Sequence, residues 1–248
     1  MIAEHVVDLS IIIPSYNEAS RLPVTLRTFH SYLSKQKFSY EIIVVLDGCT
    51  DTTLEAVQKL ERQLANLKIV ERPLNRGKGF TVKEGMLLAR GRIRLFADAD
   101  NSTDIAHFDL MQSCFARGDD VVIASRNPHD AAGAQQVVAQ VWYKRWIGQL
   151  GNLWVQLLAV PGIWDTQCGF KAFRGEVAER IFSQTTLDGW GFDIEVLALA
   201  RAMNYRIAII PARWANDARS HVRWFDYLGV LSDTLKVRFN LSARKYRF

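Results

Sequence analysis

Apolar residues in the first hundred positions fall into short runs, separated by polar loops and by longer amphipathic segments. The strand-length apolar runs are 9–13, 40–46, 68–71 and 93–97. The segments with apolar residues at helical spacing are 22–33, 52–65 and 80–89. Continuous apolar strands that alternate with helices are typical of a parallel sheet covered on both faces. The pattern therefore predicts an α/β fold, with a Rossmann-like, mostly parallel sheet and helices on both faces.

The second half of the chain has a less regular pattern. Residues 121–124 predict another strand, and residues 135–160 predict a long helical region rich in tryptophan. The remaining segments are 165–173, 188–202, a strand at 207–210 and a basic stretch to the end. No internal repeat or low-complexity linker divides the chain, so we predict a single domain over residues 1–248.

A carboxylate pair, Asp98-Ala99-Asp100, directly follows the predicted strand 93–97. Ligands of parallel α/β sheets gather at the carboxyl ends of the strands. Two carboxylates placed there are suited to a hard cation such as Mg²⁺ or Mn²⁺ with diphosphate ligands. Such an ion would neutralise charge developing on a leaving nucleoside diphosphate. Two solvated loop aspartates are the alternative, and the position at a strand end argues against it.

Three more polar loops follow the other predicted strands. Asp47 is placed to accept hydrogen bonds from a nucleobase or ribose, whereas Asp51 suits the cap of the next helix. The turn from Pro14 to Glu18 offers backbone groups and a carboxylate, and helix capping is an equal alternative. Arg76-Gly77-Lys78-Gly79 couples basic side chains to a flexible backbone, as a phosphate cradle at a helix start does.

Further candidates lie in the second half. Arg126 follows the strand at 121–124 and can donate two hydrogen bonds to a phosphate, although a solvated arginine fits the pattern nearly as well. Asp165, Asp193 and Glu195 are carboxylates among aromatic residues, an environment that raises a carboxyl pKa and suits general-base work. In a helix, Asp193 and Glu195 point to different faces, so we expect at most one at the site.

Composition narrows the partners. The chain has 248 residues and a formal net charge of +5, which favours a nucleotide, a nucleic acid or an acidic membrane. The cysteines Cys49, Cys114 and Cys168 suggest neither a disulfide framework nor a zinc site, so a reducing cytoplasm fits best. We find no signal peptide and no stretch of the roughly 20 apolar residues needed to span a bilayer. The loop 76–79 lacks the spacing of a P-loop. No G-x-G-x-x-G follows the first strand, which disfavours nicotinamide and flavin enzymes.

With these motifs assembled, the chain resembles the inverting family 2 glycosyltransferases with a GT-A fold. Within that family it is similar to the polyprenyl-phosphate and dolichyl-phosphate hexosyltransferases, which include β-glucosyltransferases and mannose synthases. The motifs, in family order, are Ile12-Ile13-Pro14-Ser15-Tyr16-Asn17-Glu18, Asp47-Gly48-Cys49-Thr50-Asp51, Asn75-Arg76-Gly77-Lys78-Gly79, Asp98-Ala99-Asp100, Ser125-Arg126 and Asp165-Thr166-Gln167-Cys168-Gly169-Phe170-Lys171. The last motif looks most like the dolichyl-phosphate β-glucosyltransferase branch.

The resemblance implies transfer of one glucose from UDP-glucose to a polyprenyl phosphate, with inversion and with Mg²⁺ or Mn²⁺. It implies a nucleotide-sugar-binding half at 8–130, an acceptor-binding half at 131–215 and a basic C-terminal tail at 216–248. The implied donor-binding residues are Pro14, Tyr16, Glu18, Asp47, Lys78, Asp98, Ala99 and Arg126, with Asp98 and Asp100 as metal ligands. The implied catalytic-site residues are Asp100, Asp165, Asp193 and Glu195. A phosphate acceptor is already an anion, so for the last three we expect positioning roles.

Contact with a membrane is expected to come from aromatic and basic residues. The tryptophans of the predicted helical region are Trp142, Trp146, Trp154 and Trp164, accompanied by Tyr143, Lys144 and Arg145. Such residues suit a helix lying in a membrane interface, and packing in the core is the alternative. The basic tail from 219 to 248 can add attraction to anionic lipid, or be a solvated tail. We therefore predict a cytoplasmic protein bound peripherally to the cytoplasmic face of a membrane.

Two groups of alternatives remain open. Within the family, the donor can be GDP-mannose or another nucleotide sugar, and the acceptor a glycan without lipid. Outside it, the positive charge and the aromatic residues allow a basic nucleotide-binding or nucleic-acid-binding module. The basic residues are spread along the chain and form no known nucleic-acid motif, so we predict no nucleic acid as partner.

Overall fold

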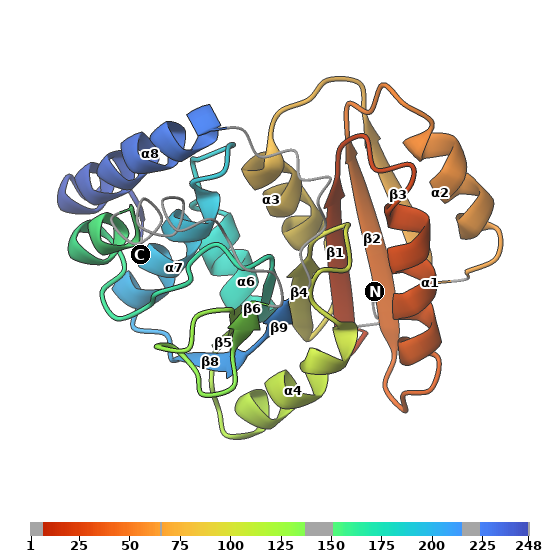
Figure 1. The fold of residues 1–248 in the computed structure, drawn as a ribbon, viewed down its shortest axis with the longest axis horizontal. Helices are drawn as coiled ribbons and strands as arrows, with labels where there is room; N and C mark the ends of the chain where they lie inside the picture. Colours follow the sequence, from red (N-terminus) through yellow and green to blue (C-terminus); the bar gives the residue numbers. More distant parts are fainter. Residues whose placement is uncertain (1–6, 65, 137–150, 215–223, 248) are drawn as a thin grey trace, which may run out of the picture.

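The computed structural model describes residues 7–64, 66–136, 151–214 and 224–247 (Figure 1). A seven-stranded sheet has the order β3-β2-β1-β4-β7-β5-β8. Its strands are β1 (Leu9–Ser15), β2 (Tyr40–Asp47), β3 (Leu67–Arg72), β4 (Ile93–Ala97), β5 (Val121–Ser125), β7 (Phe170–Arg174) and β8 (Ile207–Pro211). A separate two-stranded sheet joins β6 (Gln135–Gln136) and β9 (Arg213–Trp214). The predicted α/β class and mostly parallel sheet are confirmed.

Helices cover the two faces of the large sheet. They are α1 (Leu22–Leu33), α2 (Thr53–Glu61), α3 (Lys78–Leu88), α4 (Phe108–Ala116), α6 (Gly175–Phe182), α7 (Phe192–Ala202) and α8 (Trp224–Ser242), with a short 3₁₀ helix η1 (Ile105–His107). Residues 151–158 are also helical. The expected helix at 52–65 is shorter in the structure, where α2 ends at Glu61 and a turn follows in which Gln63 and Leu64 both donate to the carbonyl of Leu60.

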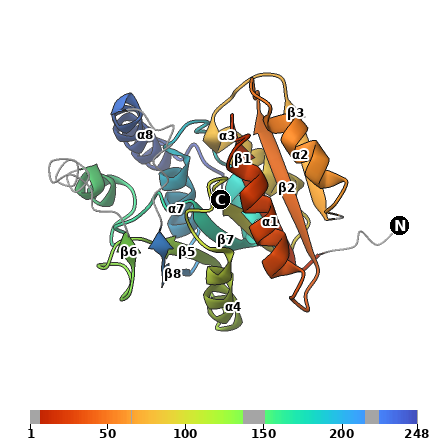
Figure 2. The ribbon, with the colours of Figure 1, turned by 45° about the vertical axis from the view of Figure 1, so that its right-hand side comes forward.

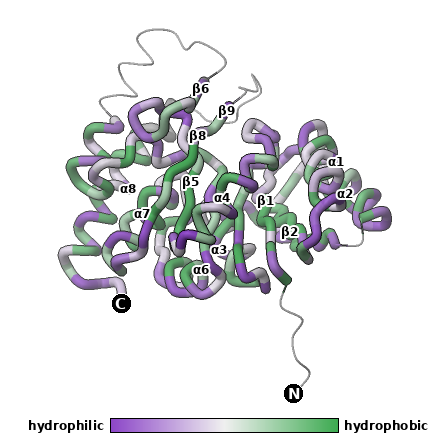
Figure 3. The backbone as a smooth tube through the Cα atoms, turned by 90° about the horizontal axis from the view of Figure 1, so that it is seen from below, coloured by the Kyte–Doolittle hydropathy of each residue, from purple (hydrophilic) through white to green (hydrophobic). Residues whose placement is uncertain are grey.

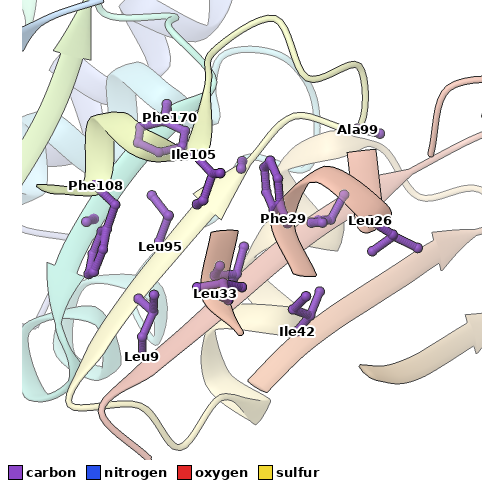
Figure 4. Close-up of a cluster of buried hydrophobic side chains, with 14 of the residues drawn as sticks. Leu9, Leu26, Phe29, Leu33, Ile42, Leu95, Ala99, Ile105, Phe108 and Phe170 are labelled. Atoms are coloured by element: carbon purple, nitrogen blue, oxygen red, sulfur yellow. The ribbon is translucent and has the colours of Figure 1, made fainter. Parts of the chain in front are cut away.

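Alternating residues of the central strands feed two hydrophobic clusters. Leu9, Ile11 and Ile13 of β1 pack with α1, α2 and α4, whereas Ile12 packs on the other face with α3, α6 and α7. Figure 4 shows the first cluster, in which Leu9 and Leu95 lie on one side of Phe29 and Leu33 of α1. Burial on both faces explains why these strands are continuous apolar runs, and Figure 3 shows β1, β2 and β5 in the hydrophobic colour.

One strand breaks the parallel order and thereby shapes the site. β7 runs antiparallel to both of its neighbours, with Phe170 opposite Ala97 of β4 and Lys171 opposite Ile123 of β5. The amino-terminal end of β7 therefore lies beside the carboxyl ends of β4 and β5. As a result, the loop 165–169 reaches the same rim of the sheet as the loops that follow the parallel strands.

The C-terminal part differs from the expected basic tail. Residues 224–242 form the helix α8, which packs outside α7, as Figures 1 and 2 show. Val237 and Tyr246 are buried in the second hydrophobic cluster. Because α8 covers its outer side, α7 is buried almost all round. None of the helices within the described residues is long and apolar enough to cross a bilayer.

The tryptophan-rich region is described only in part. Its start was expected to be helical, but Gln135 and Gln136 form a strand, since the backbone N–H of Gln135 donates to the carbonyl of Ala212. Residues 137–150, which include Trp142, Tyr143, Lys144, Arg145 and Trp146, lie outside the described residues. So do residues 215–223 of the basic stretch. The helical expectation agrees with the structure over residues 151–158.

Candidate active site

The carboxylate pair lies at the end of β4 and is oriented by the residue between its members. Ala99 is 5% exposed and packs in the first hydrophobic cluster (Figure 4), and its carbonyl accepts a 2.6 Å hydrogen bond from Thr25 Oγ1 of α1. The flanking side chains of Asp98 and Asp100 keep 34% and 24% exposure. Ala99 therefore anchors the turn in the core, and the two carboxylates face the rim.

Asp98 fits closely against the loop before β7. Its backbone N–H donates to the carbonyl of Gly169 at 3.0 Å. A Cβ atom on Gly169 would lie 1.9 Å from Asp98 Oδ2, so the carboxylate occupies space that only glycine leaves open. Asp100 Oδ1 accepts from the backbone of Ser102 at 2.9 Å, and Asp100 Oδ2 lies 3.9 Å from the Arg21 guanidinium.

Lys78, the first residue of α3, reaches this carboxylate pair. Its Nζ lies 2.6 Å from Asp98 Oδ1 and 5.1 Å from the centre of the Trp190 ring. Burial acts to lower the pKa of Lys78, but the carboxylates of Asp98 and Asp193 outweigh it and raise that pKa above its ordinary value. The loop before α3 thus brings a fixed positive charge and a helix amino terminus to the rim.

The loop that carries Lys78 is held by Asp47 at the end of β2. Both oxygens of the Asp47 carboxylate accept backbone hydrogen bonds at 2.8 Å, one from Arg76 and one from Gly77. Arg72 adds an ion pair at 3.2 Å. Asp47 is 3% exposed, so in this structure it fixes the 75–77 loop. Its predicted contact with a nucleobase or ribose stays a prediction.

The remaining residues on this side of the rim support the first loops. Asp51 accepts from the backbone of Thr53, the first residue of α2, but it stands one position before the N-cap residue Thr52, which makes no side-chain cap hydrogen bond. Glu18 is buried and forms a two-pronged ion pair with Arg21. Pro14 lies buried within β1, whereas Tyr16 is 41% exposed at the tip of the following turn. Their donor-binding roles stay predictions.

A second ion pair joins the loops after β5 and before β7. Arg126 donates from Nε and from a terminal nitrogen to the two oxygens of Asp165, each at 2.7 Å, and from its backbone to Asp165 at 2.8 Å. The guanidinium also lies 5.2 Å from the Trp214 ring. Burial favours a high pKa for Asp165, but Arg126 outweighs burial and holds that pKa below its usual range.

The two carboxylates of α7 have different surroundings, as the helical spacing predicts. Asp193 accepts from Lys171 Nζ at 2.6 Å, and both residues are almost completely buried. Its charge acts on Lys78, which places it on the side of Asp98. Burial raises the pKa of Asp193, and the Lys171 ammonium opposes the shift.

Glu195 supports structure in a different place. Its carboxylate accepts hydrogen bonds from the backbone of Thr186 and Leu187, from Thr186 Oγ1, and from Tyr246 Oη at 2.8 Å. These contacts tie α7 to the 185–188 segment and to the C-terminal residues. The structure therefore brings Asp193, and not Glu195, into the network around Asp98.

The oxygen atoms at the rim fit a hard divalent cation. Asp98 and Asp100 supply two carboxylates, and Asn101 Oδ1 and Ser102 Oγ directly after them are buried without a hydrogen-bond partner. Within the described residues, no three His, Cys, Asp or Glu side chains are grouped to hold an ion by themselves. A pair of carboxylates matches Mg²⁺ or Mn²⁺, which take the rest of their ligands from phosphates and water.

Comparison with known sequences decides the family. The sequence pattern described as Glycosyl transferase family 2 matches residues 10–182, which include the rim loops from Pro14 to Gly169. The chain belongs to glycosyl transferase family 2. This glycosyltransferase is 36% identical over 244 residues to the dolichyl-phosphate beta-glucosyltransferase of Dictyostelium discoideum, covering 93% of this chain and 74% of that protein. It is 32% identical over 253 residues to the human dolichyl-phosphate beta-glucosyltransferase, covering 96% of this chain and 77% of that protein.

Comparison with solved structures agrees on the fold. The glucosyl-3-phosphoglycerate synthase of Mycobacterium tuberculosis, in complex with Mn²⁺, UDP and phosphoglyceric acid, matches with a TM-score of 0.65 and 18% identity. The match covers 94% of this glycosyltransferase and 78% of that chain. At this identity the likeness shows the fold alone, and that fold is GT-A.

Sequence reasoning missed several residues that build the site of this glycosyltransferase. Thr25, Gly169 and Lys171 had no assigned part, although Gly169 and Lys171 lie in the motif most similar to the dolichyl-phosphate branch. A lysine within the apolar run 170–173 is the signal that could have found Lys171, since a buried cation needs a carboxylate partner. Nothing local in the sequence identifies Thr25, because its partner Ala99 lies 74 positions away.

Proposed function

We propose that this glycosyltransferase moves glucose from UDP-glucose to the phosphate of a polyprenyl or dolichyl phosphate, with inversion at the anomeric carbon. The observation that carries the proposal is the contact of Lys78 with Asp98 at 2.6 Å, beside Asp100. An ammonium and two carboxylates at one rim suit a diphosphate bound together with a divalent cation. The names of the relatives from Dictyostelium and human support glucose as the sugar and dolichyl phosphate as the acceptor.

Asp98 and Asp100 are the residues that would hold Mg²⁺ or Mn²⁺. When bound, the ion supplies positive charge that stabilises the leaving UDP. Lys78, at the amino terminus of α3, adds a second positive charge on the diphosphate. Asp47 keeps Lys78 in place, because it fixes the two residues before it. These residues bind and orient the donor.

The acceptor side needs orientation more than proton transfer. A phosphate acceptor is an anion near neutral pH, and one of its oxygens attacks the anomeric carbon on the side opposite the departing UDP. Two hydrogen bonds to Asp165 fix the plane of the Arg126 guanidinium, and we assign this cation to a phosphate group. Asp165 and Asp193 position Arg126 and Lys171, and Glu195 supports α7. We assign none of the three as a strong general base.

Membrane contact and location are part of the same proposal. A polyprenyl phosphate is embedded in a bilayer, so we propose a peripheral protein at the cytoplasmic face. Trp154, 40% exposed on the helix 151–158, and the basic residues at the C-terminal end support contact with lipid. The three cysteines are free thiols, which supports a reducing compartment.

A transfer assay with two donors tests the proposal. Radiolabelled UDP-glucose and GDP-mannose are each incubated with polyprenyl phosphate in detergent and Mn²⁺ or Mg²⁺, with EDTA as the control. We expect a lipid-linked product from UDP-glucose that EDTA abolishes. A lipid-linked product from GDP-mannose, and none from UDP-glucose, would mean that GDP-mannose is the donor. Release of UDP without a lipid product would mean that the acceptor is not a polyprenyl phosphate. No turnover of either donor would reject the proposal.

A further inference from the structure

α8 carries apolar side chains on two opposite faces. The inner face packs on the protein through Val237 and Thr234, both 0% exposed. On the outside, Leu228, Leu235 and Phe239 are 56%, 50% and 62% exposed. At 3.6 residues per turn these three lie within about 40° of one another and opposite Val237. We call Leu228, Leu235 and Phe239 the outer ridge of α8.

Positive charge flanks the outer ridge on both sides. Lys236 and Arg238 are exposed and lie about 80° to either side of Leu228 on the helix. Three more exposed cations follow the helix, namely Arg244, Lys245 and Arg247. Asp233 is the one acidic residue between positions 228 and 247, and it pairs with Lys236 at 2.9 Å. An apolar ridge with one cation on each side and three more after the end of the helix matches the layers of an anionic bilayer surface.

A neighbouring helix shows the same character. In residues 151–158, the exposed side chains are Leu153, Trp154 and Leu157, at 47%, 40% and 72%. Figures 1 and 2 both show this helix beside α8. Exposed apolar residues thus gather on two adjacent helices, which scattered surface leucines do not explain.

α8 also adjoins the proposed active site. A Cβ atom on Gly191 would lie 2.5 Å from Cβ of Asp233, so α8 packs directly against the loop at the start of α7. Trp190, the residue before Gly191, lies over Lys78, which pairs with Asp98. Asp233 lies about 140° from Leu228 on the helix, so a surface bound to the outer ridge would lie on the far side of α8 from this loop, one helix away from it.

We propose that the outer ridge of α8, with its flanking cations, docks this glycosyltransferase on an anionic lipid bilayer. The inference rests on the proposed function, because a lipid-linked phosphate is reached at a bilayer surface, and it names the segment that makes the contact. Charge complementarity favours a bilayer over a second copy of the chain, since a copy would present the same cations to one another. Docking by α8 would hold the bilayer one helix away from the loop that carries Trp190.

Vesicle co-sedimentation of the full chain tests the docking. The vesicles contain phosphatidylcholine alone or with phosphatidylglycerol. We expect binding to the anionic vesicles, reduced at least about tenfold by Leu235→Gln with Phe239→Gln. Lys236→Gln with Arg238→Gln should reduce binding to the vesicles that contain phosphatidylglycerol and should leave binding to pure phosphatidylcholine vesicles unchanged. The matched control is Leu88→Gln with Leu110→Gln, exposed leucines at 52% and 48% on α3 and α4, and it should bind as the wild type does.

Two further measurements separate this inference from the proposed function. Glucose transfer to a short, water-soluble isoprenyl phosphate without vesicles should be equal in the wild type and the outer-ridge variant. Failure of that reaction in the wild type, with vesicle binding intact, would reject the acceptor and leave the docking. If the wild-type protein does not co-sediment with anionic vesicles, the proposed docking is wrong. Dimerisation in solution that the outer-ridge variant abolishes, without vesicle binding, would assign the ridge to a second copy.

Discussion

Asp47 and Asp51, at the β1–β2 side of the rim, are held mainly by backbone N–H groups of neighbouring loops, with Arg72 as a longer partner of Asp47 at 3.2 Å. Asp98, Asp165 and Asp193, at the β4–β7–β5 side, each face a side-chain cation at a shorter distance. Asp47 accepts from two successive amides, and Asp51 accepts from the backbone of Thr53 at the start of α2. On the other side the partners are Lys78, Arg126 and Lys171, at 2.6–2.7 Å.

The difference separates a scaffold from a site that can exchange partners. A carboxylate bound to backbone amides cannot change partner without moving a loop. Lys78 and Asp98 keep 16% and 34% exposure, so each can turn to a diphosphate or a cation when one arrives. Lys171 and Asp193 are buried and support the loop from below. We infer that donor chemistry takes place on the charge-paired side.

The largest effect is expected from Asp100→Ala. It removes one of the two carboxylates facing the rim, and glucose transfer should fall by about a thousandfold. Thermal stability should change little, because the side chain is 24% exposed and its hydrogen bond is local. Initial rates with UDP-glucose and a melting curve check this, with the exposed acid Glu61→Ala as control. Normal turnover would contradict the metal assignment.

Asp165→Asn should have the next largest effect, on stability. It leaves Arg126, whose side chain is 22% exposed, without its charge partner, at a cost of about 2 kcal/mol near neutral pH. Because Arg126 holds the pKa of Asp165 low in the folded state, the contribution is complete above the ordinary carboxyl pKa of about 3.9. It is lost as the pH falls through the lower folded-state value. Urea unfolding should show a difference that is constant from about pH 5 to 8 and shrinks in stronger acid. A difference that persists in acid would mean that packing, and not charge, holds this loop.

Gly169→Ala tests the close contact between the loop before β7 and Asp98 at the end of β4. The added methyl group overlaps the Asp98 carboxylate and must displace it. We expect a stability loss of about 2 kcal/mol and weaker binding of UDP with Mn²⁺. Gly189→Ala in the same rim is the control, since a Cβ atom there meets nothing within 4 Å. Equal behaviour of the two variants would show that Asp98 has room to move.

Asp47→Asn should have the smallest effect of this series. The asparagine amide nitrogen cannot accept one of the two backbone hydrogen bonds, and the ion pair with Arg72 loses its charge. We expect a loss of about 1 kcal/mol in the free energy of unfolding, measured in urea. A large fall in UDP affinity with unchanged stability would instead support the predicted direct contact with the nucleotide.

The sequence predicts the first half of the fold well. Strands at 9–13, 40–46 and 93–97 agree with β1, β2 and β4, because residues buried on both faces form unmistakable apolar runs. The antiparallel direction of β7 was not predictable, since direction depends on pairing with β4 and β5 far away in the chain. α8 was taken for a tail because apolar residues on two opposite faces hide a helical period.

The sequence predicts many of the residues that build the site, but not which of their side chains pair with each other. Asp98 and Asp100 follow a predicted strand, and Lys78 lies in the loop before the predicted helix 80–89. The structure brings Lys78 and Asp98 into contact. That Arg126 would pair with Asp165 could not be known, because one follows β5 and the other precedes β7. Glu195 was placed with Asp193 by the motif, and helical geometry turned it to Thr186 and Tyr246 instead.

Binding of UDP tests the assignment of the donor site most directly. Isothermal titration calorimetry of the wild type with UDP should show binding that requires Mn²⁺ or Mg²⁺ and disappears with EDTA. Asp100→Ala should lose this binding, while the exposed control Glu61→Ala should retain it. Binding of UDP that is equally tight with EDTA, or equally tight in Asp100→Ala, would contradict the account.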